Sequence, residues 1–443
     1  MHFLGRYVDL TDVEEGQVVP IGDAIQTGPS SKQFLGLSGN LWRLALVTGI
    51  AQFSFSLWGW EFSIFLYTIV ELWQIGLIYS SGTLAMLLGY LMAGAVADVV
   101  GRKKAMVLSF IPMIVGLVSL AFFPFWPLIP IAYGVLQFGW SFVLIISRAV
   151  PADEIAAHGG KDAARKFTMV LLPAFLVDGL SPMLGAFLLG RGFTPQNLHV
   201  IAAAGAVVAC LATIAFVRES LSDRVIEKAR SGPIISFRQL GPNFWKLAGG
   251  MLGFYFFFNA ALAYFGLMVT EGWGISEEVY GYSWSAFSLT SVLLMHTVSG
   301  LADRNVKRAL LVGVIANGLM IVSFSLLSGI PALILLNILW AMPVVLWIGA
   351  ERALVITGVG VEAKGRALGT YQFVMSSTNL FAAPFGAVLT DVAGGFRQMW
   401  AICGVAALGT IVLTAAGLRM IRLEGPTEIS FEVEDSPDLP DRR

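Results

Sequence analysis

The stretch GAVADVVGRKKAMVL, Gly94–Leu108, places an acid, a glycine and three cations in one turn between two long apolar runs. The stretch GLADRNVKRALLV, Gly300–Val312, has a similar arrangement, and its Asp303 lies 205 positions after Asp98. A charged turn that occurs twice at so long a spacing in a hydrophobic chain predicts an internal duplication.

The composition places most of the chain in lipid. Of the 443 residues, 56% are hydrophobic and only 13% are charged, and the mean hydropathy is +0.76. A soluble domain usually has about 25% charged residues. The net charge of −1 predicts no nucleic-acid partner. Cys210 and Cys403 both lie in apolar segments, so we expect no disulfide, no zinc or other metal site and no cofactor.

The apolar segments predict twelve transmembrane helices, because one span needs about 20 apolar residues. The predicted spans are 44–70, 72–97, 105–125, 126–147, 167–190, 198–217, 247–270, 279–302, 309–329, 330–350, 367–390 and 398–418. Two uncharged runs, 105–147 and 309–350, are each long enough for two spans. Prolines at 124–130 and the SGIP turn at Ser328–Pro331 predict the hairpins inside these runs.

Further landmarks keep the spacing of the charged turns. Arg148 and Arg352 lie 204 positions apart, and Pro182 and Pro384 lie 202 apart. The predicted fold class is therefore an all-α membrane protein of two parallel six-helix repeats. The predicted division is an N-terminal tail (1–43), a first bundle (44–217), a linker (218–246), a second bundle (247–420) and an acidic, disordered tail (421–443).

The distribution of basic residues predicts the orientation. With the N-terminus inside, 26 of the 28 Lys and Arg residues fall on the inner side, and only Arg191 and Arg397 fall outside. The N-terminus lacks the pattern of a cleaved signal peptide. We therefore expect a multi-pass protein of the cell (plasma) membrane with both termini in the cytoplasm.

The first charged turn resembles the signature of the loop between spans 2 and 3 in the major facilitator superfamily, roughly G-x-x-x-D-x-x-G-R-K/R. Five residues fill this signature: Gly94, Asp98, Gly101, Arg102 and Lys103. The second turn is similar to the family's second copy, although Val306 stands where the glycine would be. The stretch VEAKGRALGTY, Val361–Tyr371, resembles the loop before span 11. The resemblance covers residues 44–420 and implies a secondary transporter that works by alternating access.

The charged turns are predicted to form a cytoplasmic gate. Asp98 would lie at a helix C-terminus, where a negative charge is disfavoured by about 0.3–1 kcal/mol, so it needs a partner. Arg102 is one candidate partner, and the family resemblance implies another at the start of span 11. The full set of gate candidates is Gly94, Asp98, Gly101, Arg102, Arg148, Gly300, Asp303, Arg304, Glu351 and Arg352. Alternatively, these residues only fix the topology of the chain or extend toward the membrane surface.

Two carboxylates, Glu61 and Asp178, fall inside the predicted spans, where no Lys or Arg is expected. Asp178 lies 12 residues after Lys166, or about 18 Å along a helix, which is near the middle of the bilayer. A buried acid is costly unless it is protonated or paired, so both residues are candidates for coupling to H⁺. The alternative is a neutral, structural carboxyl.

The resemblance implies that spans 1, 4, 7 and 10 line a central substrate cavity. Polar and aromatic residues recur on single faces of these spans: Ser54, Trp58, Tyr133, Gln137, Trp140, Tyr255, Asn259, Asn337 and Trp340. Such a stripe suits a polar organic ligand. Alternatively, the aromatic residues face lipid and the amides join helices.

We interpret the sequence as a secondary active transporter of a small organic solute, favouring proton-coupled symport. We expect a monomer in the lipid bilayer. One alternative is a proton-antiport exporter of amphipathic compounds, although the arginine typical of that branch is missing from Ile129–Phe138. Another is a transport-inactive membrane sensor or scaffold. An enzyme is not expected, because no H-E-x-x-H, Walker or G-x-S-x-G motif occurs.

Overall fold

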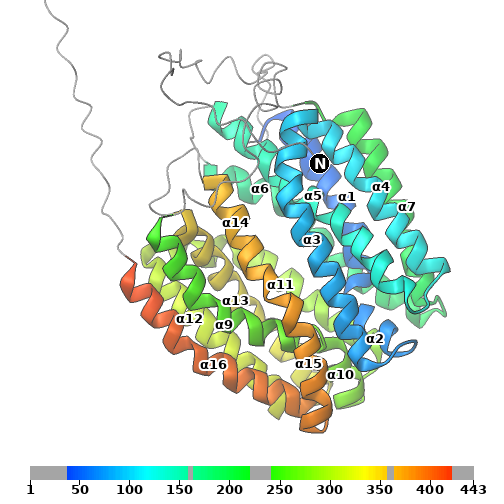
Figure 1. Cartoon of the computed structure of the whole chain (residues 1–443), viewed down its shortest axis with the longest axis vertical. Coiled ribbons are helices and arrows are strands. Elements are labelled where there is room, and N and C mark those ends of the chain that lie inside the picture. The colour runs from blue at the N-terminus through cyan, green and yellow to red at the C-terminus, as the bar shows by residue number, and fades with distance from the viewer. Residues whose placement is uncertain (1–36, 158–162, 220–240, 357–363, 422–443) are drawn as a thin grey trace, which may run out of the picture.

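The computed structural model describes residues 37–157, 163–219, 241–356 and 364–421 (Figure 1). The described helices of the first half are α1 (Gly39–Gly59), α2 (Phe62–Tyr67), α3 (Leu72–Val100), α4 (Arg102–Phe122), α5 (Leu128–Ala157), α6 (Ala163–Gly190) and α7 (Pro195–Phe216). Those of the second half are α9 (Pro242–Leu262), α10 (Phe265–Trp273), α11 (Glu277–Arg304), α12 (Val306–Leu326), α13 (Ile330–Ile356), α14 (Lys364–Ser377), α15 (Asn379–Ala393) and α16 (Phe396–Met420). The predicted tails and most of the predicted linker lie outside the described residues.

These helices follow the predicted spans. Among the described residues, nine helices are long and apolar enough to cross a membrane, and the pair α9 and α10, bent by 46°, makes a tenth. α1 with α2 and α11 correspond to the other two predicted spans, which are richer in polar side chains. The predicted hairpins are confirmed, since α4 ends at Phe122 before α5, and α12 ends at Leu326 before α13.

Local capping signals explain several helix starts. Ser38 caps α1 by accepting a hydrogen bond from the Leu41 N–H at 3.2 Å. Thr194 caps α7, which has a proline at its first position, and Asn305 caps α12. Each cap satisfies a backbone donor that has no partner within the helix, so these polar residues fix where the helices begin.

Three spans that the sequence predicts as continuous are broken. Span 1 divides into α1 and α2 around Glu61, span 7 into α9 and α10 around Tyr264, and span 11 into α14 and α15 at Thr378. Glu61 and Tyr264 lie 203 positions apart, close to the repeat spacing. The breaks in spans 1 and 7 are therefore a shared feature of the two halves.

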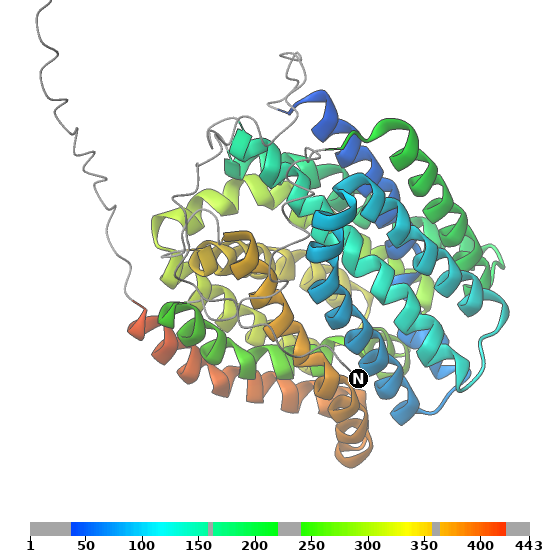
Figure 2. The ribbon, with the colours of Figure 1, turned by 45° about the horizontal axis from the view of Figure 1, so that its top comes forward.

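Helix packing confirms the six-helix repeat. In the first half, α1 packs on α6 and α7, α5 packs on α3 and α4, and α4 packs on α7. In the second half the corresponding pairs occur: α9 packs on α15 and α16, α13 packs on α11 and α12, and α12 packs on α16. Figures 1 and 2 show the two bundles side by side, with α1–α7 in blue to green and α9–α16 in green to red.

The halves meet through two long helix pairs, α3 with α15 and α6 with α11, and through the short helices α2 and α10. Glycines allow close approach at these contacts. A Cβ on Gly76 of α3 would lie 2.8 Å from the Pro384 Cα atom of α15. A Cβ on Gly281 of α11 would lie 2.6 Å from the Ala186 Cβ atom of α6. Small residues at such contacts let helices pack tightly in lipid, where no hydrophobic effect drives them together.

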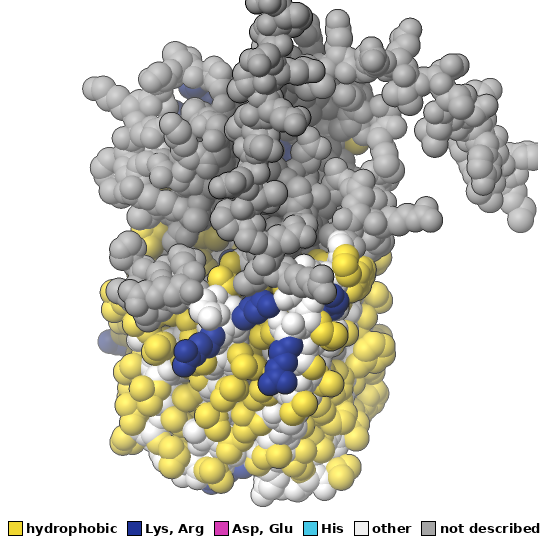
Figure 3. Space-filling model, turned by 90° about the vertical axis from the view of Figure 1, so that its left-hand side faces the viewer, with side chains coloured by type: hydrophobic (Ala, Val, Ile, Leu, Met, Phe, Trp, Pro, Cys, Tyr) yellow, Lys and Arg dark blue, Asp and Glu magenta, His cyan; other side chains and the backbone are white. Residues whose placement is uncertain are grey.

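The outer surface is apolar. Large hydrophobic side chains such as Leu84, Val115, Leu211 and Val412 are more than half exposed. Figure 3 shows one side of the molecule, on which apolar side chains cover most of the described surface. Several Lys and Arg side chains gather in the upper part of the described surface in this view. This pattern fits a protein whose flanks face lipid.

Candidate functional site

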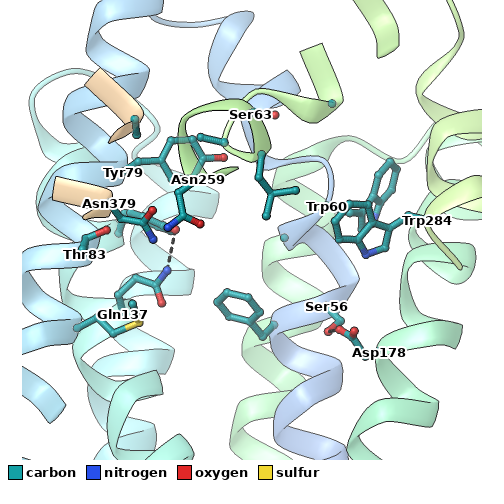
Figure 4. Close-up of a pocket in the computed structure, with 18 of the residues that line it drawn as sticks. Ser56, Trp60, Ser63, Tyr79, Thr83, Gln137, Asp178, Asn259, Trp284 and Asn379 are labelled. Carbon is teal, nitrogen blue, oxygen red and sulfur yellow. Dashed lines mark hydrogen bonds between the residues drawn. The ribbon is translucent and has the colours of Figure 1, made fainter. Parts of the chain in front are cut away.

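A cavity of about 340 Å³ lies between the two halves (Figure 4). Its walls come from α1, α2, α3, α5 and α6 of the first half and from α9, α10, α11 and α15 of the second. The lining residues are Gln52, Phe55, Ser56, Gly59, Trp60, Ser63, Tyr79, Thr83, Met86, Tyr133, Gln137, Asp178, Asn259, Leu262, Ala263, Gly266, Tyr280, Trp284, Asn379 and Ala383. A ligand in this cavity would contact both halves.

One acid, Asp178 of α6, lines the cavity. The Gln52 side-chain amide donates a hydrogen bond to the Asp178 Oδ1 atom at 3.0 Å, and the Ser56 hydroxyl donates to the same oxygen. The Gln52 amide also donates to the Ser56 Oγ atom at 2.7 Å. No described residue donates to the other oxygen, Oδ2. This carboxyl is therefore fixed by α1 through one oxygen, and its second oxygen can bind a proton or a ligand donor.

Hydroxyl and amide groups from both halves form one wall. Gln137 of α5 donates to the Tyr133 hydroxyl at 2.6 Å, and its own Oε1 atom is buried without a partner among the described residues. Asn259 of α9 donates to the Thr378 hydroxyl at 3.2 Å. Asn379 lies near Asn259 in Figure 4. The amide and hydroxyl groups of this wall favour a ligand with hydrogen-bonding substituents.

Aromatic rings form the opposite wall, on the same side as Asp178 in Figure 4. The Trp60 ring lies 5.7 Å from the Tyr280 ring between their centroids, and Tyr280 lies 6.3 Å from Trp284. The Trp60 indole donates to the Leu57 carbonyl at 3.0 Å, which holds its orientation. These flat apolar surfaces can stack on a planar ligand.

The structure places three of the predicted cavity residues, Tyr133, Gln137 and Asn259, in this lining. Trp140 lies behind it, since its ring stacks on the lining residue Phe55 at 4.9 Å. Asn259 and Tyr133 come from opposite halves, as expected for a cavity between the repeats.

The other predicted cavity residues lie outside this lining. The Trp58 indole donates to the Ser54 carbonyl at 2.9 Å, and its ring packs 4.9 Å from the His199 ring. Asn337 donates to the Leu333 carbonyl at 3.0 Å, and the Trp340 indole donates to Asn317 at 2.8 Å. The remaining residue, Tyr255, donates to Glu351, as described below. The partners of these groups lie within one half, although the Asn337 Oδ1 atom is buried without a partner among the described residues.

Most of the lining was not predicted from the sequence. The predicted residues came only from spans 1, 4, 7 and 10, and in span 1 the lining positions, such as Gln52 and Ser56, differ from the predicted ones. Side chains from spans 2, 5, 8 and 11 complete the cavity, among them Tyr79, Thr83, Trp284 and Asn379. The polar residues inside these apolar spans were the feature of the sequence that could have indicated a cavity lining.

Glu61 occupies a different environment from Asp178. It lies at the break between α1 and α2, it is fully buried, and neither carboxyl oxygen has a hydrogen-bond partner among the described residues. It does not line the cavity. An ionised carboxylate here would have no described donor, so the site accommodates the neutral acid.

The first charged turn is anchored by a residue from the predicted linker. Gly101, between α3 and α4, has φ +98°, and a Cβ there would lie 2.5 Å from the Glu219 Oε2 atom. The Glu219 carboxylate accepts the backbone N–H groups of Arg102 at 2.9 Å and Lys103 at 3.1 Å. The glycine of the signature therefore makes room for a carboxylate cap on α4, which the sequence did not reveal.

The side-chain contacts of the predicted gate are only partly visible. Gly94 and Gly300 lie within α3 and α11. The side chains of four other gate candidates lie outside the described part of the chain: Asp98, Arg148, Asp303 and Arg304. Their role as a gate stays a prediction, although α3 and α14 are in contact.

Glu351 joins three helices of the second half. Its carboxylate accepts hydrogen bonds from the Tyr255 hydroxyl of α9 and the Tyr371 hydroxyl of α14, both at 2.7 Å. Glu351 is only 5% exposed, whereas its neighbour Arg352 is exposed. The hydrogen bonds that Glu351 accepts thus lie within one half of the molecule.

Two six-helix repeats that enclose a polar cavity in an apolar shell define a membrane transporter of the secondary type. The model of the Major Facilitator Superfamily matches residues 44–351, and the chain belongs to this family. The family consists of transporters rather than enzymes. A comparison with curated proteins gives no match.

Solved structures of three transporters share the fold. A mutant of the nucleoside transporter NupG aligns with a TM-score of 0.71 at 13% identity, over 86% of this chain and 100% of that one. A mutant of the peptide transporter POT with sulfate aligns with a TM-score of 0.70 at 12% identity, over 90% and 97%. The human organic anion transporter MFSD10 (TETRAN) aligns with a TM-score of 0.62 at 16% identity, over 85% and 98%. At these identities the likeness concerns the fold alone.

Proposed function

We propose that this chain is a proton-coupled symporter that moves a small polar organic solute by alternating access. The observation that supports this most is the position of Asp178 in the cavity between the halves, with one oxygen held by Gln52 and Ser56 and the other free of described donors. A carboxyl in the substrate cavity can take up a proton on one side of the membrane and release it on the other.

Asp178 is a better coupling residue than Glu61. Coupling requires an acid that is stable in both protonation states during the cycle. Asp178 has hydrogen-bond donors for its charged form and a cavity through which a proton can arrive. Glu61 has no described donor and does not line the cavity, so we assign it a structural role as a neutral acid.

The contacts between the halves support a rocking motion. α2 and α10 touch at one end, where a Cβ on Gly266 would lie 3.0 Å from the Ser63 hydroxyl oxygen and from Ile64. In the proposal this end is extracellular and is closed in the structure, so the cavity would open next to the cytoplasm. Both termini are then cytoplasmic, and the chain works as a monomer in the plasma membrane.

Proton antiport is the second candidate, because the free Asp178 Oδ2 atom could also bind a cationic group on an exported amphipathic compound. A cation and a proton would then compete for the same carboxyl. In a symporter, by contrast, the solute and the proton occupy the cavity together.

Proton flux in proteoliposomes tests the proposal. The purified chain is reconstituted with a pH dye inside, a pH gradient is imposed, and a library of solutes is added to wild type, Glu61→Gln and Asp178→Asn. Asp391→Asn, which changes an exposed acid at the end of α15, is the matched control.

We expect solute-dependent proton entry that Asp178→Asn abolishes and that the other two variants keep. Flux that Asp178→Asn leaves intact would refute the assignment of the coupling residue. Solutes that drive protons outward would indicate antiport. No flux with any solute would favour a transport-inactive sensor.

A further inference from the structure

The charge of the cavity restricts what it can bind. Asp178 is the single acid among the described lining residues, and no lysine, arginine or histidine is among them. The described lining is therefore neutral when Asp178 is protonated and negative when it is ionised. In both states a buried anion would lack a positive partner, which makes its desolvation costly.

A cation fits only one of these states. It can pair with ionised Asp178, but it has no counter-charge once that carboxyl carries a proton. A symporter moves its solute together with the coupling proton, so the solute must bind while the described lining is neutral. This requirement favours an uncharged solute.

The shape and polarity of the walls narrow the chemistry further. The amide side chains of Asn259 and Asn379 can bond to polar substituents. Trp60 and Trp284 offer flat apolar surfaces opposite them (Figure 4). The volume of about 340 Å³ lies at the lower end of the range of roughly 300–1,000 Å³ for ligand sites. The cavity thus suits one small, ring-containing molecule.

We propose that the solute is an uncharged molecule with a planar heterocyclic ring and several hydrogen-bonding substituents, of the chemical kind of a nucleoside. The amide wall would bind the polar substituents, and the indole rings would stack on the heterocycle. This inference rests on the proposed function, because it takes the cavity to be the substrate site in the protonated state.

Calorimetric binding to the purified full-length chain tests the proposal without any need for transport. The probes are adenosine and uridine, their 5′-monophosphates, and 5′-amino-5′-deoxyadenosine, which keep the rings and change the 5′ substituent and its charge. We expect a neutral nucleoside to bind at least ten-fold more tightly than its phosphate and its amine.

Substitutions of the aromatic wall supply the second readout. Trp284→Leu should weaken nucleoside binding by about 3- to 10-fold, while Trp284→Phe should keep most of it, because a ring can still stack. Trp245→Leu is the matched control, since that tryptophan lies on α9, outside the cavity lining, and is 46% exposed.

The proposal is overturned if a phosphate or the amine binds as well as the neutral nucleoside, if Trp284→Leu behaves like Trp245→Leu, or if neither nucleoside binds. Nucleoside binding without solute-driven proton flux would instead refute the symport proposal and leave the ligand class standing.

Discussion

Replacing Gly76 by alanine should shift the balance between the two conformations of the proposed alternating-access cycle. The new Cβ would lie 2.8 Å from the Pro384 Cα atom, 3.1 Å from the Pro384 nitrogen and 3.3 Å from the Ala383 carbonyl oxygen. All three are backbone atoms of α15, so no flexible side chain can move aside. Overpacking of this kind costs about 1–3 kcal/mol.

This cost falls on the contact between the halves, so it should disfavour the conformation in which α3 and α15 are pressed together. A change of about 1–3 kcal/mol corresponds to roughly a 5- to 150-fold shift in the equilibrium between the two conformations. The folding of each six-helix half should change little, since neither half contains both residues.

The distance between spin labels on the two halves measures this shift. Nitroxide labels at Arg191→Cys and Gln398→Cys report on the end that carries α2 and α10, with the native Cys210 and Cys403 replaced. We expect Gly76→Ala to enlarge the population of long distances.

Gly249→Ala is the matched control, because a Cβ there meets no atom within 4 Å. The reasoning is refuted if Gly76→Ala keeps the wild-type distance distribution, or if Gly249→Ala changes it equally.

Three further predictions concern stability. Tyr255→Phe removes a donor to Glu351 and should lower the free energy of unfolding by about 1–2 kcal/mol in a detergent denaturation series; an unchanged midpoint would contradict it. Glu219→Ala removes the cap on α4 at a cost of about 0.5–2 kcal/mol, so hydrogen exchange should speed up in the first turn of α4 and not at the capped start of α7. Burial, and then repulsion by Glu271, raise the pKa of Glu277 above its ordinary value of 4.5. The charged form is thus disfavoured in the folded state, so Glu277 is least destabilising below pH 4.5, and stability falls as the pH rises through the raised pKa. Glu277→Gln should make the temperature of thermal unfolding depend less on pH between pH 4 and 8. A pH dependence equal to that of wild type would contradict the predicted destabilisation by ionised Glu277.

The sequence was sufficient to predict the spans and the repeat, because a run of about twenty apolar residues matches the thickness of the bilayer core as a helix. It did not predict the break in span 1. Trp60, at the break, keeps helical dihedrals (φ −67°, ψ −30°), and no proline stands between α1 and α2 to mark the interruption.

The cavity shows why periodicity alone could not identify the site. Span 1 carries two polar stripes at helical spacing. The predicted stripe contained Ser54 and Trp58, whereas the stripe of Gln52 and Ser56 lines the cavity. No residue of either stripe is exposed, and only the positions of neighbouring helices distinguish the stripes: α6 presents Asp178 to one of them. The position of Asp178 well inside an apolar helix could be predicted from the sequence, but its partners on α1 could not.

Transport with and without a proton gradient tests the central claim, that Asp178 couples proton movement to the rocking of the halves. Proteoliposomes with wild type or Asp178→Asn take up labelled solute in two assays. For exchange they are loaded with unlabelled solute, and for accumulation they are left empty and placed under a pH gradient. Asp178→Asn should keep exchange within a few-fold of wild type and lose accumulation. The cavity would still open alternately to the two sides of the membrane, but residue 178 could no longer bind and release a proton. Accumulation by Asp178→Asn at the wild-type level would contradict the claim.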